Sequence, residues 1–487
     1  MAQLGGMMLL STMNQNFGAF VNWLESTIFY SISLNENVSI PLVVVWLMVA
    51  SIVFTVYFNF INIRGFKHAI DVVRGKYDDP NDTGEVSHFQ ALTTALSGTV
   101  GIGNIAGVAL AVSIGGPGAT FWMILGGLLG MANKFAECTL AVKYRNVHAD
   151  GEVSGGPMYY LQKGFAQRGF PIVGKLAAVF FAIACIGGAM GAANMFQINQ
   201  ATQQLVQVTG AENSFFHGNE WVFGLIMATL VGAVIIGGIK SIAKVTDKIV
   251  PFMVGVYFLG VMTVLITHID KVPNALWLII DGAFNAPAIS GGFLGVMVFG
   301  FQRAFFSNEA GIGSAAIAHS AAKTDEPVSE GIVALLEPVI DTVVVCTMTA
   351  LVIIITGEYQ TGQTEGVLLT SRAFGSVISW FPSVLSFAVI LFALSTIISW
   401  SYYGLKAWTF LFGETRQSEM IFKFIFCLTI ILGSTVTLGD VFRFSDCMIF
   451  SMCIPNVFGL YMFAPELKKD LDAYFAKLKT GEIKEYA

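Results

Sequence analysis

Two apolar stretches of the sequence are interrupted by glycine and small polar residues. The first covers residues 95–107 and includes Ser97, Thr99 and four glycines, and the second covers residues 298–313. Glycine loosens a helix and frees backbone N–H and C=O groups, which hydrocarbon cannot satisfy. Such backbone is tolerated at membrane depth only where it lines a site, and two broken segments in the two halves of a chain are typical of the binding site of a transporter.

The first break would offer different chemical groups on its two sides. A half-helix that begins near Gly103 presents free N–H groups and the positive end of its dipole, which suit a carboxylate. A half-helix that ends near Val100 presents free carbonyl oxygens, which suit a small cation such as sodium. Ser395 and Thr396, in a distant apolar segment, add two adjacent hydroxyls. The alternatives are close helix packing for the glycines and hydrogen bonding of the hydroxyls to their own helix.

The second break gathers polar side chains that are costly to bury in a membrane. They are Gln302, Arg303, Ser307, Asn308 and Glu309. Charged residues at such depth usually have a partner and a function, so Arg303 and Glu309 serve either the site and its gate or an ion pair that holds the helices together. Two further pairs lie about one turn apart, where a structural role is favoured: Glu337 with Asp341, and Lys134 with Glu137.

Amide side chains recur in the apolar segment around residue 197. Asn194, Gln197 and Gln200 have approximately helical spacing, so they either bind a ligand or form hydrogen bonds between helices. Trp400 lies one turn after Thr396 and is either a core aromatic residue or a gate over the site.

Composition places these segments in a polytopic membrane protein. The chain has 487 residues, of which 55% are hydrophobic and 12% charged, against about 25% charged residues in soluble proteins. The six cysteines fall in apolar stretches without metal-binding spacing, which indicates buried apolar residues rather than ligands. A channel would need a continuous polar stripe along several spans, and an enzyme would need a nucleophile–base pair or a metal cluster. The sequence shows neither pattern and no nucleic-acid-binding surface.

A helix needs about 20 apolar residues to cross a bilayer, and the sequence predicts eleven such spans. They lie near residues 41–60, 90–113, 118–142, 176–206, 220–239, 249–268, 290–317, 331–356, 383–405, 424–439 and 444–464. Residues 13–30, with apolar residues at helical spacing, are predicted to form an amphipathic helix on the membrane surface.

Loop charges predict the orientation of these spans. Most of the 26 Lys and Arg residues fall in alternate loops and in the C-terminal tail, and the other loops hold only Lys271, Arg372 and Arg443. The positive-inside rule therefore places the N-terminus outside and the C-terminus in the cytoplasm.

The two breaks begin two sets of five spans that have opposite orientation. This predicts an inverted 5+5 repeat with one additional N-terminal span. The predicted units are an N-terminal segment (1–38), the additional span (39–64), the first repeat (88–268), the second repeat (289–465) and a cytoplasmic tail (466–487).

Four separated motifs resemble those of the alanine or glycine:cation symporter family. They lie at residues 95–109, 155–160, 306–315 and 399–404, for example Gly155-Gly-Pro-Met-Tyr-Tyr160. The resemblance implies an all-α leucine-transporter-like fold and sodium-coupled uptake of alanine or glycine across a prokaryotic inner membrane, without an organic cofactor. Some members of the family prefer glutamine.

The resemblance also implies site residues. The carbonyls of Ser97 and Val100 would join Ser395 and Thr396 at the sodium ion. Thr99 and Asn104 fall where some members of the wider fold hold a second sodium ion, and Asn104 alternatively faces the substrate. The predicted substrate-binding residues are Thr99, Gly101, Gly103, Asn104, Gln197, Phe301 and Trp400.

The sequence therefore predicts a sodium-coupled importer of small neutral amino acids that works by alternating access and has no catalytic residues. A proton-coupled transporter of the same fold, with Glu309 or Asp341 as the proton carrier, is the nearest alternative.

Overall fold

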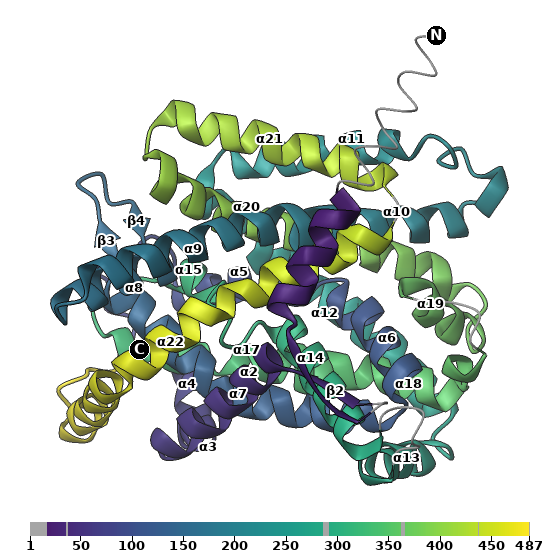
Figure 1. Ribbon diagram of the computed structural model, residues 1–487, viewed down its shortest axis with the longest axis horizontal. Coiled ribbons are helices and arrows are strands. Elements are labelled where there is room, and N and C mark those ends of the chain that lie inside the picture. Colours follow the sequence, from purple (N-terminus) through teal and green to yellow (C-terminus); the bar gives the residue numbers. More distant parts are fainter. Residues whose placement is uncertain (1–16, 36–37, 286–291, 362–365, 437, 487) are drawn as a thin grey trace.

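The computed structural model describes residues 17–35, 38–285, 292–361, 366–436 and 438–486. The described chain is a bundle of helices with two small hairpins (Figure 1). In Figure 1, α9 (Pro171–Met190) and α22 (Leu438–Thr480) run side by side along the long axis, and α20 (Phe381–Phe412) packs against α9.

The first half of the chain contains these helices: α2 (Leu42–Tyr57), α3 (Ile61–Arg64), α4 (Phe66–Val73), α5 (His88–Thr99), η1 (Gly103–Gly107), α6 (Val108–Gly115), α7 (Gly118–Lys143), α8 (Pro157–Gln167), α9, η2 (Gly191–Met195), α10 (Phe196–Val208), η3 (Ala211–Asn213), α11 (Glu220–Ile235) and α12 (Gly238–Thr267). The second half contains α13 (Val272–Phe284), α14 (Gly292–Asn308), α15 (Ala315–His319), α16 (Pro327–Val333), α17 (Leu336–Pro338), η5 (Val339–Cys346), α18 (Thr347–Thr356), η6 (Glu358–Gln360), α19 (Val367–Gly375), α20, α21 (Arg416–Thr435) and α22.

Each of the eleven predicted spans coincides with one or more of these helices. Among the described residues, six helical segments are long and apolar enough to cross a membrane, and the bent pair α5 and η1–α6 makes a seventh. The other four predicted spans fall on α2, α7, α11 and α14, which are shorter or less apolar. The eleven crossings and the inverted repeat therefore stay predictions.

Both predicted breaks are present. α5 and the following helix are bent by 51° between Thr99 and Gly103. α14 ends at Asn308, and α15 begins at Ala315 after a non-helical segment. Two π-helical segments, η2 and η5, interrupt long helices, and a third, η1, begins the half-helix that follows the first break. Such π-helical turns are frequent at functional sites.

The two antiparallel hairpins were not predicted from the sequence. β1 (Ser31–Asn35) pairs with β2 (Val38–Pro41), and β3 (Asn146–Val147) pairs with β4 (Val153–Ser154). Residues 17–28 form a helix that exposes Phe17, Phe20 and Trp23 and buries Val21, as an amphipathic surface helix requires. The first sixteen residues of the predicted N-terminal segment lie outside the described residues.

Segments that the loop charges assign to one side of the membrane contact one another. Lys76 pairs with Glu485 at 2.8 Å, and Lys477 lies 2.5 Å from Glu326. All four residues lie in predicted cytoplasmic segments. Helix α22 continues to Thr480, so most of the predicted tail is helical.

Glycines let the helices pack closely. Gly118 begins α7 against α13, and a Cβ atom added there would lie 2.1 Å from the backbone of Gly282. The backbone of Gly282 cannot move away from an added Cβ atom as a flexible side chain could.

We predict that Gly118→Ala destabilises the protein by about 1–3 kcal/mol through overpacking. The measurement is the melting temperature of the purified protein in detergent. Gly255→Ala in α12 is the matched control, because no atom lies within 4 Å of its added Cβ. Equal melting temperatures for the two variants would contradict the close packing of α7 and α13.

Candidate functional site

The first break leaves the helical hydrogen-bond pattern between Val100 and Gly103. The Gly101 N–H donates to Asn104 Oδ1 at 2.9 Å, and the Ile102 N–H donates to Gln197 Oε1 at 3.1 Å. Side chains thus satisfy two of the backbone donors. Within the described chain, the Gly103 N–H and the Val100 carbonyl have no hydrogen-bond partner. Val100 is fully buried and Gly103 is partly buried, and unpaired backbone groups at such positions are costly without a ligand.

Two crossed hydrogen bonds tie this break to α20. Ser97 Oγ donates to the Ser395 carbonyl at 2.7 Å, and Thr396 Oγ1 donates to the Ser97 carbonyl at 3.0 Å. A Cβ atom at Gly101 would lie 2.5 Å from Thr396 Oγ1, so a side chain there would push the break away from α20. The structure thus brings Ser97 and Thr396 together at the break, whereas the Ser395 hydroxyl donates to the Phe392 carbonyl of its own helix at 3.0 Å and only the Ser395 carbonyl contacts Ser97.

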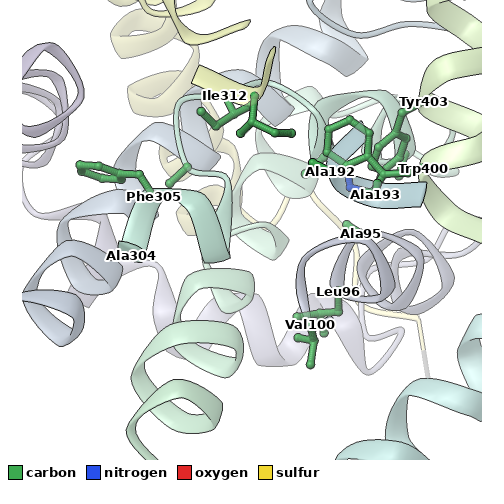
Figure 2. Close-up of a cluster of buried hydrophobic side chains, with 14 of the residues drawn as sticks. Ala95, Leu96, Val100, Ala192, Ala193, Ala304, Phe305, Ile312, Trp400 and Tyr403 are labelled. Carbon is green, nitrogen blue, oxygen red and sulfur yellow. The ribbon is translucent and has the colours of Figure 1, made fainter. Parts of the chain in front are cut away.

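A small cavity lies between the two breaks. It has a volume of about 20 Å³, which is room for about one or two water molecules. Its lining residues are Gly98, Thr99, Gly103, Ala192, Ala193, Gln197, Phe306, Ser307, Glu309, Thr396, Trp400 and Ile449. Figure 2 shows Trp400 and Tyr403 beside Ala192 and Ala193 at this place. An amino acid needs more room, so binding requires lining side chains to move outward.

The second break contributes a carboxylate to the cavity. Glu309 follows α14 and has a φ of 55°, a left-handed conformation that is costly for a residue other than glycine and is found at functional sites. Its side chain accepts a hydrogen bond from Trp400 Nε1 at 3.2 Å and another from Ser314 Oγ. The sequence left the role of Glu309 open, and the structure places it in the cavity wall.

Asn104 lies behind the break rather than in the cavity wall. Its Nδ2 donates to Asp341 Oδ1 at 2.6 Å, while its Oδ1 accepts from Gly101. Ser307 Oγ and Thr342 Oγ1 each donate to Asp341 Oδ2 at 2.7 Å. Asn104 therefore holds the backbone of the break against η5 and links it to the end of α14.

Most of the predicted substrate residues lie in the cavity wall or directly beside it. Thr99, Gly103, Gln197 and Trp400 line the cavity, and Gly101 packs directly beside Gln197. Gln197 acts as an interhelical hydrogen-bonding residue as well as a wall residue, because it binds the Ile102 N–H.

Phe301 is outside the lining set, contrary to its predicted place in the pocket wall. Its ring packs against Trp122 at 6.0 Å between centroids and against Gly126 of α7. Phe306 lines the cavity instead. Five residues along a helix turn by about 140° beyond one full turn, so the two rings leave α14 on different faces.

Several lining residues were missed by the sequence analysis. Ala192 and Ala193 come from η2 and Ile449 from α22. The run Gly191-Ala-Ala193 in an apolar span was the available signal, since small residues allow close approach. Nothing in the sequence distinguishes Ile449 from an ordinary core residue.

The model of the sodium:alanine symporter family matches residues 25–487. The chain belongs to the sodium:alanine symporter family. This family assignment confirms the resemblance found in the four sequence motifs. It identifies a membrane transporter rather than an enzyme, within a family that moves an amino acid together with a cation.

Relatives in the sodium:alanine symporter family align over nearly their whole length. The sodium/alanine symporter AgcS of Methanococcus maripaludis is 38% identical over 456 residues, which cover 93% of this chain and 98% of AgcS. The probable sodium/glutamine symporter GlnT of Bacillus subtilis is 31% identical and aligns over 92% of this chain and 91% of GlnT.

One solved structure has a fold similar to that of this chain. The crystal structure of MhsT in complex with L-phenylalanine aligns with a TM-score of 0.52 at 15% identity, over 80% of this chain and 99% of that chain. The likeness supports the leucine-transporter-like class of fold predicted from the sequence.

We predict that Asn104→Ala destabilises the protein by about 1–3 kcal/mol, because the buried Asp341 carboxylate loses a donor and the Gly101 N–H keeps only the Thr99 carbonyl as its acceptor. Thermal melting of the purified protein measures the change. Asn219→Ala is the control, because the Asn219 side chain is exposed and donates only to the Phe215 carbonyl of its own segment. A melting temperature as high as that of the control variant would show that Asn104 does not hold the break.

Proposed function

We propose that the protein imports a small neutral amino acid, alanine or glycine, together with sodium. The observation that carries this proposal is the first break, which presents an unpaired N–H at Gly103 in the cavity wall and, three residues earlier in the chain, an unpaired carbonyl at Val100. These groups match the opposite charges of a carboxylate and a cation.

Sodium would bind between the first break and α20. Its oxygen ligands would be the carbonyls of Ser97 and Val100 with the hydroxyls of Ser395 and Thr396. Ser97 and Thr396 already contact each other at 3.0 Å, so little movement would bring their oxygens onto one ion. Unwound backbone carbonyls are the usual sodium ligands in such transporters.

The amino acid would bind in the cavity between the two breaks. Its carboxylate would accept from the Gly103 N–H at the positive end of the half-helix. Its ammonium group would face the Glu309 carboxylate, and its side chain would lie between Trp400 and Phe306. The lining side chains must move outward for any amino acid, and a hydrogen atom or a methyl group as its side chain requires the smallest movement.

The buried pair Arg303 and Asp446 would close the outer side of the site. Arg303 Nη2 lies 2.7 Å from Asp446 Oδ2 and joins α14 to α22. The guanidinium carbon lies 5.4 Å from the centroid of the Phe306 ring, which lines the cavity. Separation of α14 from α22 would therefore open the cavity wall and break the ion pair in one movement.

The predicted topology completes the proposal: eleven spans as a 5+5 inverted repeat plus one span, with the N-terminus outside and the C-terminus inside, in a prokaryotic inner membrane. Support comes from contacts between segments assigned to the same side, such as Arg443 with Glu25 at 3.0 Å outside and Lys477 with Glu326 inside. Alternating access follows if sodium and the amino acid favour the same conformation.

Glutamine is the second candidate substrate, because GlnT is named a probable sodium/glutamine symporter. Counterflow in proteoliposomes, screened across amino acids with and without sodium, separates the candidates. We expect sodium-dependent counterflow of alanine and glycine well above that of glutamine. If glutamine moves fastest, the size argument from the cavity fails. If no amino acid shows sodium-dependent movement, the whole proposal fails.

We predict that Thr396→Ala raises the sodium concentration for half-maximal uptake by about tenfold, which corresponds to the loss of about 1.4 kcal/mol of binding free energy. Uptake of labelled alanine against sodium concentration measures it. Thr409→Ala is the matched control on the same helix, because the Thr409 hydroxyl bonds only the Lys406 carbonyl of α20. An unchanged sodium dependence in Thr396→Ala would remove α20 from the ion site.

A further inference from the structure

A second cavity lies apart from the one between the two breaks. Its volume is about 240 Å³, against about 20 Å³ for the first. Its lining residues are Glu85, Glu152, Ile236, Gly237, Gly238, Ile239, Lys240, Tyr402, Leu405, Lys406, Glu419 and Lys423. The two cavities share no lining residue. The charged lining residues all fall in segments that the loop charges assign to the cytoplasm, so we call this space the cytoplasmic cavity.

Five parts of the chain meet at the cytoplasmic cavity. They are the segment before α5 (Glu85), the turn between β3 and β4 (Glu152), the first turn of α12 (Lys240), α20 (Tyr402 and Lys406) and α21 (Glu419 and Lys423). A ligand in the cavity would therefore touch the cytoplasmic ends of α5 and α20, the two helices that meet at the proposed sodium site. Within α21, Lys423 and Glu419 pair with each other at 3.5 Å.

The other charged side chains of the cytoplasmic cavity do not pair with one another. In the described chain, Lys240 and Lys406 form no ion pair with a carboxylate. Glu85 and Glu152 likewise form none with a basic group of the described chain. Lys406 Nζ donates instead to Ser154 Oγ at 3.1 Å. Two positive and two negative groups thus surround one space without contact between them, which suits a ligand that carries both charges.

The first turn of α12 adds backbone donors to the cytoplasmic cavity. The residue that precedes this helix is Gly237, which has no side chain to cap it, and Gly237 and Gly238 both line the cavity. The first N–H groups of a helix have no partner within it, and the positive end of its dipole favours a carboxylate. With Lys240 in the same turn, this side of the cavity suits a carboxylate group.

Tyr402 brings a buried hydroxyl that lacks a partner. The residue is only 3% exposed, and among the described residues its hydroxyl forms no hydrogen bond. Buried tyrosine hydroxyls normally have a partner, because leaving one unpaired is costly. Lys406 Nζ lies 5.6 Å from the centroid of the Tyr402 ring, which places a positive charge close by. A carboxylate bound there would supply the acceptor that the hydroxyl lacks.

We infer that the cytoplasmic cavity is a second binding site, which takes a zwitterionic amino acid from the cytoplasm without sodium. The carboxylate of the ligand would face the first turn of α12, Lys240 and the Tyr402 hydroxyl. Its ammonium group would face Glu85 and Glu152. The ligand carries both charges itself, so no cation is needed to balance it. This inference rests on the proposed function for the choice of alanine and glycine as ligands.

The test is the equilibrium binding of labelled alanine to the purified full-length protein in detergent, with and without sodium. We expect one site per chain in sodium-free buffer and two in sodium. Unlabelled glycine is expected to displace the alanine bound without sodium. Propionate, which lacks the ammonium group, and ethylamine, which lacks the carboxylate, are expected to leave it bound.

Tyr402→Phe tests the cavity with little risk to the fold, because the hydroxyl that it removes has no partner in the described chain. We expect an unchanged melting temperature and sodium-free binding weaker by about fivefold or more, through the loss of one hydrogen bond to a charged group.

Lys240→Gln is the second variant, and we expect it to weaken sodium-free binding by about tenfold. Lys244→Gln is its matched control, because Lys244 is exposed, lies one turn further along α12 and is outside the lining set. The control is expected to bind as wild type does. The site that requires sodium is expected to be unchanged in every variant.

Absence of sodium-free alanine binding in wild type would overturn the inference. Displacement by propionate as effective as that by glycine would also overturn it, because the cavity would then be a site for anions. Unchanged sodium-free binding in both Tyr402→Phe and Lys240→Gln would place that binding elsewhere. Absence of the sodium-dependent site alone would instead refute the proposed function and leave the second site standing.

Discussion

Backbone polar groups cannot be left unsatisfied in hydrocarbon, and the architecture around the cavity follows from this constraint. The first break opens the helix between Val100 and Gly103. Asn104 and Gln197 supply two of the missing acceptors, and Thr396 supplies a donor to the last turn of α5. Each of these side chains comes from a position where it also faces a neighbouring helix. The break is therefore held by its surroundings, and within the described chain the Gly103 N–H and the Val100 carbonyl remain unpaired.

The second break is held in place by a different set of contacts. Glu309 adopts a left-handed backbone conformation, and its carboxylate is held by Trp400 and Ser314. Asp341 connects the two breaks through Asn104 and Ser307. Because the same carboxylate holds both, a movement of one broken helix is transmitted to the other. This arrangement suits a symporter, in which the amino acid and the cation must act on one conformational change.

The sequence predicted the broken helices and the helical positions of all eleven segments, because composition and glycine placement act locally. The contact between Ser97 and α20 followed from the family resemblance instead. The sequence did not distinguish Phe301 from Phe306, since that choice depends on how α14 rotates against α7. The sequence also could not identify the partners of Glu337, which appeared only as one of two acidic residues about one turn apart. In the structure its partners are His319 and Lys134, from two other helices, and such long-range pairing leaves no local pattern. The β3–β4 hairpin was missed because two-residue strands carry no periodicity, and β1 and β2, with five and four residues, are short as well.

The three π-helical segments have a consequence for how this site can vary between relatives. A π-helical turn holds one more residue than an α-helical turn and behaves as a one-residue insertion in its helix. η1, η2 and η5 all lie next to the cavity or to Asn104, which holds the break. Loss of that single residue would restore a regular α-helix and turn the side chains on one side of it by about 100° relative to those on the other. A deletion of one codon could therefore replace part of the cavity wall while the outer ends of the helix keep their packing. Substrate range in such a fold can change by length as well as by substitution.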